Sequence, residues 1–257
     1  LHYEAAPRGE IQIPLVGEYR RYYDRCTTCG HYFSRHNLDM GALYKGDYLT
    51  VTYGGAKGIE EAFKRISNLP AEKSDNFHRV ERVTQFADKW FEARKTQRRL
   101  IDIGSGLGIF VSGMKNMGWC CTALDPDERF SGHARRNIGV DALTCNFGCE
   151  PCEDIGTFQC VSLNKVLEHV EDPVDFLTKA KKLLASDGFI YIEVPDGEMA
   201  IRESDQREEF FIEHHHVFSS NSLPILIAQA GMDLLVMERL REPSGKYTLF
   251  SFIAANT

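Results

Sequence analysis

The sequence predicts an α/β fold: a seven-stranded, mostly parallel sheet covered by helices, an antiparallel C-terminal hairpin, and a small irregular N-terminal segment. Three observations lead to this prediction. From about residue 73 onward, short apolar runs alternate with amphipathic stretches, which is typical of strand–helix repeats. A glycine-rich turn follows the first apolar run. The last two strands are joined by the short turn 242–245, so they must be antiparallel neighbours.

The order of helices and strands follows from hydrophobic periodicity. Apolar residues recur at helical spacing from Asp75 to Phe91. Asp172 and Pro173 supply an N-cap and a proline at the first helical position, and Asn221 is expected to cap the last helix. Strands are expected at residues 100–103, 119–125, 142–145, 158–163, 189–194, 233–240 and 247–254, and helices at residues 75–91, 109–117, 128–137, 173–184 and 222–230.

The other elements are arranged around the turn after the first strand, where Asp102 precedes Gly104, Gly106 and Gly108. Glycines let the backbone take strained dihedrals and let a ligand approach it closely. A dinucleotide site needs G-x-G-x-x-G, but Ile109 stands at the position of the third glycine. A carboxylate at Asp102 would repel a pyrophosphate and suits a cofactor with a cationic amine. S-adenosylmethionine has such an amine and no phosphate.

A second carboxylate supports this interpretation. The strand 119–125 ends in Asp125, about 20 residues past the first glycine, where an acidic residue accepts hydrogen bonds from ribose hydroxyls. The alternative is that the glycines only form a tight turn. The turn, Asp102 and Asp125 together favour a cofactor site. Arg79, on the helix before the turn, is expected to form an exposed salt bridge, the alternative being a contact with the cofactor carboxylate.

From about Asn76 to its end, the sequence resembles the class I S-adenosylmethionine-dependent methyltransferases, which have a Rossmann-like fold. The glycine turn, the strand 161–164 and the loop 166–170 carry the resemblance. Asn146 and Phe147 fall where this family places a polar residue on the adenine amine and an apolar residue on its ring. From these residues and from the resemblance we expect cofactor contacts from Asp102, Gly104, Ser105, Gly106, Gly108, Asp125, Pro126, Asn146, Phe147 and Asn164.

The composition argues against several functional classes. The 257 residues carry a net charge of −7 and a pI near 5.7, which disfavours binding to nucleic acid or to an anionic membrane. No apolar run approaches the roughly 20 residues of a membrane helix, and no signal-peptide pattern opens the sequence. The eight cysteines are spread along the chain, which is typical of reduced thiols. We expect a cytoplasmic protein with a small-molecule substrate; the sequence does not indicate its oligomeric state.

Two parts of the chain are expected to differ in role: an N-terminal arm at residues 1–72 and a cofactor-binding domain at residues 73–257. The tyrosine-rich stretch 44–53 resembles a lid that folds over the cofactor, the alternative being an aromatic cluster that packs the arm onto the domain. Cys149 and Cys152 form a C-x-x-C motif followed by a loop signal. We expect an inert loop there rather than a redox or metal site.

A second C-x-x-C motif lies in the arm. Cys26 and Cys29, with a turn at Gly30, are similar to one knuckle of a zinc ribbon. Related methyltransferases often carry such a ribbon, but a structural zinc needs four ligands. His31 and His36, or a further pair upstream, would complete the set. The alternative is two reduced thiols in a turn.

Two histidine-containing segments are candidates for the catalytic group. A weakly nucleophilic hydroxyl acceptor needs a proton acceptor near neutrality, and histidine is suited to that role. Glu168 and His169 follow the fourth strand, at the edge of the sheet where ligands bind. Their alternative role is a hydrogen-bonding pair in the loop beside the cofactor.

The second candidate segment follows the fifth strand. Residues 213–219 resemble the E-H-x-x-x-F-S stretch of methyltransferases that modify nucleotide-linked sugars, where a Tyr-x-Glu-His set lines the substrate pocket. Phe211 stands at the tyrosine position here. The resemblance implies that Glu213 and His214 line the pocket and that His214 is the base.

The sequence therefore predicts an enzyme that transfers a methyl group from S-adenosylmethionine to a small metabolite, a sugar or another hydroxylated biosynthetic intermediate, on oxygen or carbon. The alternative is a non-catalytic cofactor-binding protein that assembles with a partner through its N-terminal knuckle.

Overall fold

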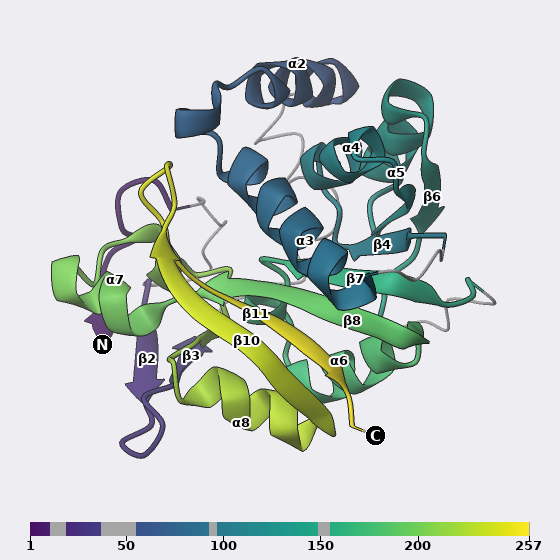
Figure 1. Cartoon of the computed structure of the whole chain (residues 1–257). Helices are drawn as coiled ribbons and strands as arrows, with labels where there is room; N and C mark the ends of the chain where they lie inside the picture. Colours follow the sequence, from purple (N-terminus) through teal and green to yellow (C-terminus); the bar gives the residue numbers. More distant parts are fainter. Residues whose placement is uncertain (11–18, 37–54, 93–96, 149–154, 257) are drawn as a thin grey trace.

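A central sheet of seven strands organises the computed structural model, which describes residues 1–10, 19–36, 55–92, 97–148 and 155–256 (Figure 1). Its strand order is β10-β11-β8-β7-β4-β5-β6. The five strands from β8 to β6 are parallel, and β11 pairs antiparallel with both β8 and β10. This confirms the predicted fold class. The strands are β4 (Arg99–Ile103), β5 (Cys120–Asp125), β6 (Asp141–Thr144), β7 (Phe158–Asn164), β8 (Leu184–Pro195), β10 (Met232–Arg241) and β11 (Tyr247–Ala255).

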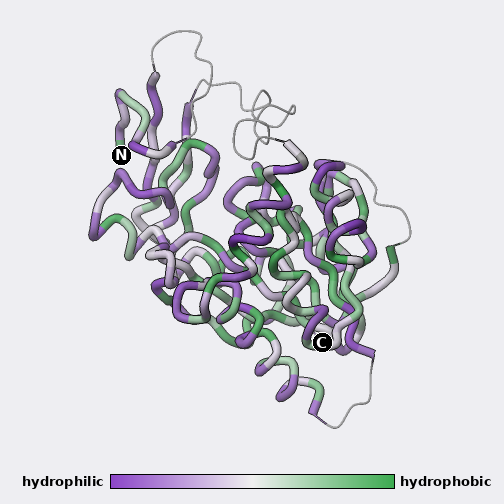
Figure 2. The backbone as a smooth tube through the Cα atoms, turned by 90° about the horizontal axis from the view of Figure 1, so that it is seen from above, coloured by the Kyte–Doolittle hydropathy of each residue, from purple (hydrophilic) through white to green (hydrophobic). Residues whose placement is uncertain are grey.

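Helices cover both faces of this sheet. The main helices are α2 (Ala56–Ser67), α3 (Asp75–Phe91), α4 (Ile109–Asn116), α5 (Glu128–His133) with the π-helical turn η3 (Ala134–Ile138), α6 (Pro173–Lys181), α7 (Gly197–Glu203) and α8 (Ser222–Gln229). Strand residues alternate between the faces: Leu100 packs with α3 and α4, whereas Ile101 packs with α6 and α8. Figure 2 shows the hydrophobic segments concentrated inside the molecule.

Of the two helix caps predicted from the sequence, the structure confirms one. The Asp172 carboxylate accepts hydrogen bonds from the N–H groups of Val174 and Asp175 at 3.1 and 2.9 Å, which confirms the predicted cap of α6. The predicted cap of α8 is wrong. The Asn221 side chain makes no cap hydrogen bond, and Ser219 Oγ accepts the N–H of Ser222 at 2.9 Å instead.

The N-terminal residues form a second, smaller sheet. Its strands are β1 (His2–Tyr3), β2 (Arg21–Arg25), β3 (Tyr32–His36) and β9 (His216–Val217), in the antiparallel order β1-β2-β3-β9. Because β9 comes from the far end of the chain, this sheet joins the N-terminal strands to the segment that follows α7. A cluster of buried residues that includes Tyr3, Tyr23 and Phe210 packs between them.

Two further findings bear on the predictions. Cys26, Cys29, Cys120, Cys121 and Cys160 are free thiols, as expected, but that expectation is wrong for Cys145, which is disulfide-bonded. In the described part of the chain, no helix combines the length and the apolar character needed to cross a bilayer.

Candidate functional site

The glycine turn, residues 104–108, connects β4 to α4 at the carboxyl edge of the sheet. Gly104, Gly106 and Gly108 all have positive φ angles, of 72°, 49° and 70°. A Cβ atom on Gly104 would lie 2.8 Å from Val166, and one on Gly108 would lie 2.5 Å from Ile138. A Cβ on Gly106 would meet nothing within 4 Å. The outer glycines therefore permit close packing, and the middle one faces open space.

Asp102, just before the turn, is buried, with 2% of its surface exposed. Its Oδ1 accepts hydrogen bonds from Ser162 Oγ at 2.6 Å and from Asn164 Nδ2 at 2.9 Å. These partners lie on β7, which pairs with β4 so that Asp102 stands opposite Ser162. Burial raises the pKa of Asp102 to about 7, although both hydrogen bonds act to lower it.

Asp125, at the end of β5, holds the turn from the other side. Its Oδ2 accepts the N–H of Gly106 at 2.8 Å and its Oδ1 accepts the N–H of Asp127 at 2.9 Å. Burial raises the pKa of Asp125 to about 6. Each carboxylate oxygen can accept a second hydrogen bond, so Asp125 can fix the turn and still accept from a ligand hydroxyl.

The polar atoms at this edge fit the expected cofactor. Asn164 Oδ1 and Ser105 Oγ are buried and lack a hydrogen-bond partner among the described residues. Buried polar atoms are normally paired, and the amine and hydroxyls of S-adenosylmethionine are groups that such atoms can bind. The open side of Gly106 and the Asp102 carboxylate belong to the same edge. The residues of this turn are therefore suited to that cofactor.

The structure gives less support to the residues that are expected to contact the adenine. Pro126 and Asn146 are exposed. Phe147 is half-buried, and its ring packs edge-to-face against Phe176 at a centroid distance of 5.1 Å. These positions remain predictions from the family resemblance.

The expected salt bridge of Arg79 is present, but it is largely buried rather than exposed. Its Nη2 donates to Glu193 Oε2 at 2.5 Å, and the Arg79 side chain is 15% exposed whereas that of Glu193 is fully buried. Burial acts to raise the pKa of Glu193, but the Arg79 charge and hydrogen bond prevail and lower it to about 2. Arg79 also acts to lower the pKa of Asp102, so its charge lies near the cofactor edge.

Unlike Arg79, Lys165 was not singled out by the sequence. It directly follows β7 and adopts a left-handed φ of 58°, a conformation that is strained for a residue with a side chain. Its Nζ donates to Thr248 Oγ1 at 2.5 Å, and desolvation lowers the pKa of this ammonium group. This turn directs the chain toward the 3₁₀ helix η4 (Leu167–His169).

The two candidate histidines, His169 and His214, come together, and we call them the histidine pair. Their ring centroids are 4.8 Å apart with the planes at 69°. Nδ1 of His169 is 2.9 Å from the carbonyl oxygen of Glu213, and Nδ1 of His214 is 2.9 Å from that of Glu209. A carbonyl only accepts, so each Nδ1 carries the proton and each neutral ring has its lone pair on Nε2. Burial lowers the pKa of both residues, which favours neutral rings.

Two carboxylates flank the histidine pair. Glu168 is 1% exposed, and neither of its carboxylate oxygens has a hydrogen-bond partner in the described structure. Burial raises the pKa of Glu168 to about 7. Burial also raises the pKa of Glu213. The predicted catalytic residues Glu213, His214 and His169 are thus adjacent, and Glu168 joins them.

The N-terminal sheet supports the segment that carries His214. The Tyr23 hydroxyl donates to the carbonyl oxygens of Phe211 and His214, at 2.9 and 2.7 Å. The N–H of His215 donates to the carbonyl oxygen of Glu168 at 2.8 Å, which ties this segment to the loop after β7. The relative position of the two histidines is therefore fixed by backbone contacts.

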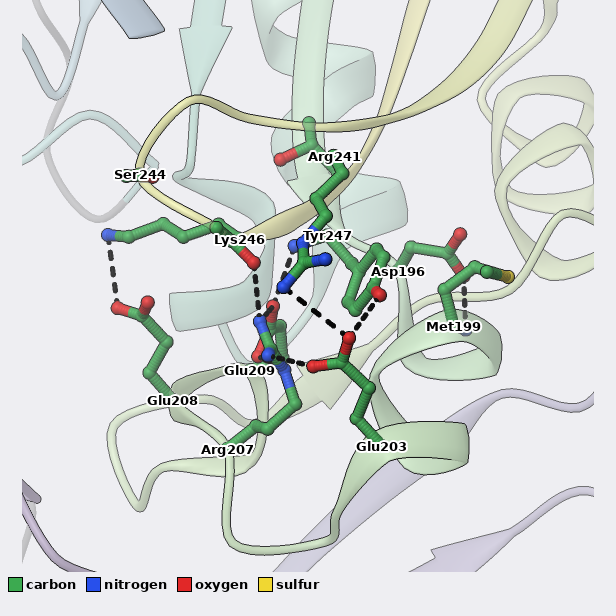
Figure 3. A network of polar contacts seen from close by, with 12 residues as sticks. Asp196, Met199, Glu203, Arg207, Glu208, Glu209, Arg241, Ser244, Lys246 and Tyr247 are labelled. Carbon is green, nitrogen blue, oxygen red and sulfur yellow. Dashed lines mark hydrogen bonds and ion pairs between the residues drawn. The ribbon is translucent and has the colours of Figure 1, made fainter. Parts of the chain in front are cut away.

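An ion-pair network fixes the same segment from the side of the C-terminal hairpin (Figure 3). Arg207 contacts both oxygens of Glu209, at 3.0 and 2.9 Å, and donates to Glu203 at 2.5 Å. Glu209 Oε1 also accepts the N–H of Tyr247 at 2.7 Å. Because the Glu209 carbonyl accepts from His214, this network helps to hold that imidazole in place.

The predicted metal ligands Cys26 and Cys29 form a tight turn between β2 and β3. Backbone N–H groups of Cys29 and Thr28 donate to the Cys26 sulfur and lower its pKa, as in a metal-binding knuckle. His31 is not a further ligand, because its two ring nitrogens contact Ser222 Oγ and His216 Nδ1 at 3.1 and 3.0 Å.

Within the described ranges, no third potential ligand lies near Cys26 and Cys29. The three potential metal ligands that do lie together in these ranges are Glu168, His169 and His214. The predicted lid at residues 44–53 and the motif formed by Cys149 and Cys152 lie outside the described residues.

Comparisons with known proteins show which domain family the chain matches. A family model described as a methyltransferase domain matches residues 73–236. The ubiquinone biosynthesis O-methyltransferase of Caulobacter sp. (strain K31) is 32% identical over 99 residues, covering 37% of this chain and 39% of the relative. The C-methyltransferase NovU of Streptomyces niveus is 26% identical over 160 residues, covering 61% of this chain and 38% of NovU. The chain thus spans about two fifths of the length of these relatives.

Solved structures share the fold. The 1,6-didemethyltoxoflavin-N1-methyltransferase of Burkholderia thailandensis, with bound 1,6-didemethyltoxoflavin and S-adenosylhomocysteine, matches with a TM-score of 0.62 at 15% identity and covers 90% of this chain and 97% of that one. Magnesium protoporphyrin IX methyltransferase from Synechocystis PCC 6803 matches with a TM-score of 0.57 at 12% identity, covering 82% and 100%. Since the family model matches more than half of the sequence, the chain belongs to the methyltransferase-domain family.

Proposed function

We propose that this chain transfers a methyl group from S-adenosylmethionine to a hydroxyl group of a small metabolite, such as a sugar or another hydroxylated biosynthetic intermediate. The observation that carries the proposal is the histidine pair, in which His169 and His214 both present an unprotonated Nε2 beside the loop that packs on the glycine turn. The names of two relatives, an O-methyltransferase and a C-methyltransferase, support methylation of a small molecule.

The cofactor would be held at the carboxyl edge of the sheet. Asp102 would pair with its amine, and Asp125 would accept its ribose hydroxyls while fixing Gly106. Asn146 and Phe147 would contact the adenine. When bound, S-adenosylmethionine supplies an electrophilic methyl carbon. The acceptor oxygen would bond to this carbon while the carbon–sulfur bond breaks and leaves its electron pair on sulfur.

The protein's own task is then to place and deprotonate the acceptor. Nε2 of His214 would accept the hydroxyl proton, and the hydrogen bond from Nδ1 to Glu209 keeps that tautomer in place. His169 and Glu213 would line the acceptor side of the pocket. A Tyr-x-Glu-His set has a tyrosine hydroxyl at the position of Phe211, and phenylalanine has none. The absence of this hydroxyl favours methylation on oxygen rather than on carbon.

Cys26 and Cys29 are proposed as half of a structural zinc site. The lowered pKa of Cys26 supports this, because zinc binds the thiolate. Metal analysis is expected to show one zinc per chain more in the purified protein than in a C26S/C29S variant. Equal zinc content in the two proteins would contradict it.

A turnover assay tests the main proposal. Methyl-labelled S-adenosylmethionine is incubated with the protein and a panel of sugars, nucleotide-linked sugars and phenols, and the label is followed into product. The His214→Gln variant should bind S-adenosylhomocysteine as the parent does, with turnover reduced by about 10²- to 10⁴-fold. Tight cofactor binding without transfer to any acceptor would favour the non-catalytic alternative.

A further inference from the structure

Glu168, His169 and His214 form a cluster with the composition of a cation site. One potential ligand atom from each lies within 4.8 Å of the others. Two ligands that bind one ion at about 2.1 Å lie at most about 4.2 Å apart, so small side-chain movements would close the cluster around an ion.

The hydrogen bonds of the cluster occupy one ring nitrogen of each histidine and leave the other available. Both Nδ1 atoms donate to backbone carbonyls, an arrangement that directs Nε2 toward a metal in histidine ligands. Neither Nε2 has a partner among the described residues. The contacts that fix the two rings therefore resemble the outer contacts of a metal site.

Glu168 provides an independent observation. Its carboxylate is buried, yet both oxygens lack hydrogen bonds within the described structure. The nearby ammonium group of Lys165 donates to Thr248 instead. A buried carboxylate without a partner is unfavourable, and a cation bound by Glu168 would remove that penalty.

We propose that Glu168, His169 and His214 bind one divalent transition-metal cation, which acts on the acceptor oxygen in the methyl transfer proposed above. Two imidazoles and one carboxylate suit Zn²⁺, Co²⁺ or Mn²⁺ better than Mg²⁺, which prefers oxygen ligands. Three protein ligands leave a coordination position for the acceptor hydroxyl, and a cation lowers the pKa of a hydroxyl that contacts it. With the ion bound, the hydroxyl proton leaves to solvent water and His214 holds the ion, and this replaces the general-base role given to His214 in the methyl transfer proposed above.

Cobalt binding tests the site directly, and the test is made in the C26S/C29S variant of this chain so that those thiols cannot contribute. Chelator-treated protein is titrated with Co²⁺ and followed by its visible absorption. We expect one ion per chain, d–d bands and no sulfur-to-metal charge-transfer band. Glu168→Gln and His214→Gln should each weaken binding at least about 10-fold. His78→Gln is the matched control, because His78 and Glu81 form an exposed pair at 3.7 Å on α3, and it should leave binding unchanged.

The outcomes separate this inference from the proposed function, on which its role in catalysis rests. Circular dichroism and S-adenosylhomocysteine titration establish that each variant is folded. Cobalt binding that is absent, or that survives both Glu168→Gln and His214→Gln, would overturn the inference. Full turnover by chelator-treated protein would also overturn it while the proposed function stands. Site-specific cobalt binding without methyl transfer to any acceptor would support the site and count against the proposed function.

Discussion

The Oδ2 atom of Asp125 accepts a hydrogen bond from the backbone N–H of Gly106 at 2.8 Å, which joins the end of β5 to the middle of the glycine turn. The same carboxylate also accepts the N–H of Asp127. One side chain thus shapes the turn and faces the expected ribose position. Removal of the Asp125 side chain should therefore weaken cofactor binding in two ways, by the loss of a ligand contact and by a change in the shape of the turn.

Asp125→Ala should weaken the binding of S-adenosylhomocysteine by about 10- to 100-fold, since a hydrogen bond to a charged group contributes about 1.5–3 kcal/mol. Isothermal titration calorimetry measures the change. Asp127→Ala, which keeps the Asp125 carboxylate, is the control and should bind nearly as the parent does. Equal losses in the two variants would contradict the role given to Asp125.

Gly106 and Gly108 should respond differently to alanine. Gly106→Ala adds a methyl group where nothing lies within 4 Å. The only cost to stability should be the strain of a side chain in the left-handed conformation, which lowers the free energy of unfolding by about 1–2 kcal/mol. The methyl group would occupy the cofactor side of the turn and should abolish measurable binding of S-adenosylhomocysteine.

Gly108→Ala places a Cβ atom 2.5 Å from Ile138 Cδ1. The resulting overpacking costs about 1–3 kcal/mol in addition to the left-handed backbone strain that Gly106→Ala also introduces. Urea denaturation is expected to show the larger loss of unfolding free energy for Gly108→Ala. The reverse order of stabilities, or normal cofactor binding by Gly106→Ala, would disagree with the geometry of the turn.

Cofactor affinity should depend on pH through Asp102. Burial raises the pKa of this carboxyl to about 7, and a cationic amine binds its ionised form. Below pH 7 the carboxyl must lose a proton for the amine to bind, so affinity should fall by up to about tenfold per pH unit and level off above pH 7. Titrations of S-adenosylhomocysteine from pH 6 to 8.5 measure the profile. Asp102→Asn should bind weakly with a much flatter profile, and a variant that retains the slope of the parent would assign the titration to another group.

Tyr23→Phe tests whether the N-terminal sheet positions the histidine pair. The change removes the hydroxyl that donates to the carbonyl oxygens of Phe211 and His214. A carbonyl that loses its hydrogen-bond partner away from solvent costs about 1–3 kcal/mol, and because these two carbonyls are only partly buried the unfolding free energy should fall by an amount at the lower end of that range. Turnover should also fall, with S-adenosylhomocysteine affinity unchanged. Tyr22→Phe, on the more exposed face of β2, should preserve both quantities. A Tyr23→Phe variant with the kcat of the parent would separate the N-terminal sheet from the chemistry.

The sequence was informative where the determinants are local. The glycine turn, Asp102 and Asp125 lie at strand ends, so their convergence follows from the geometry of a parallel sheet. His169 and His214 were expected at the same edge because each follows a strand. The seven strands along the chain, and the antiparallel pairing of the last two, could be predicted from hydrophobic runs and a short turn.

Long-range pairings could not be predicted in this way. The ion pair of Arg79 with Glu193 joins residues 114 positions apart, and hydrophobic periodicity carries no signal for it. The pairing of β3 with β9 depends on a two-residue strand, which is too short to show a period. The strand β8 begins at Leu184, five residues before the predicted start, because Ser186, Asp187 and Gly188 have the composition of a turn although they continue the strand.

The central claim is that the glycine turn, with Asp102 before it and Asp125 beside it, binds S-adenosylmethionine. Calorimetric titration at pH 8 with S-adenosylhomocysteine and, separately, with NAD⁺ tests this most directly. The account predicts one S-adenosylhomocysteine per chain and an NAD⁺ affinity at least about 100-fold weaker, a difference of about 2.7 kcal/mol. Tight binding of NAD⁺ with no measurable binding of S-adenosylhomocysteine would contradict it.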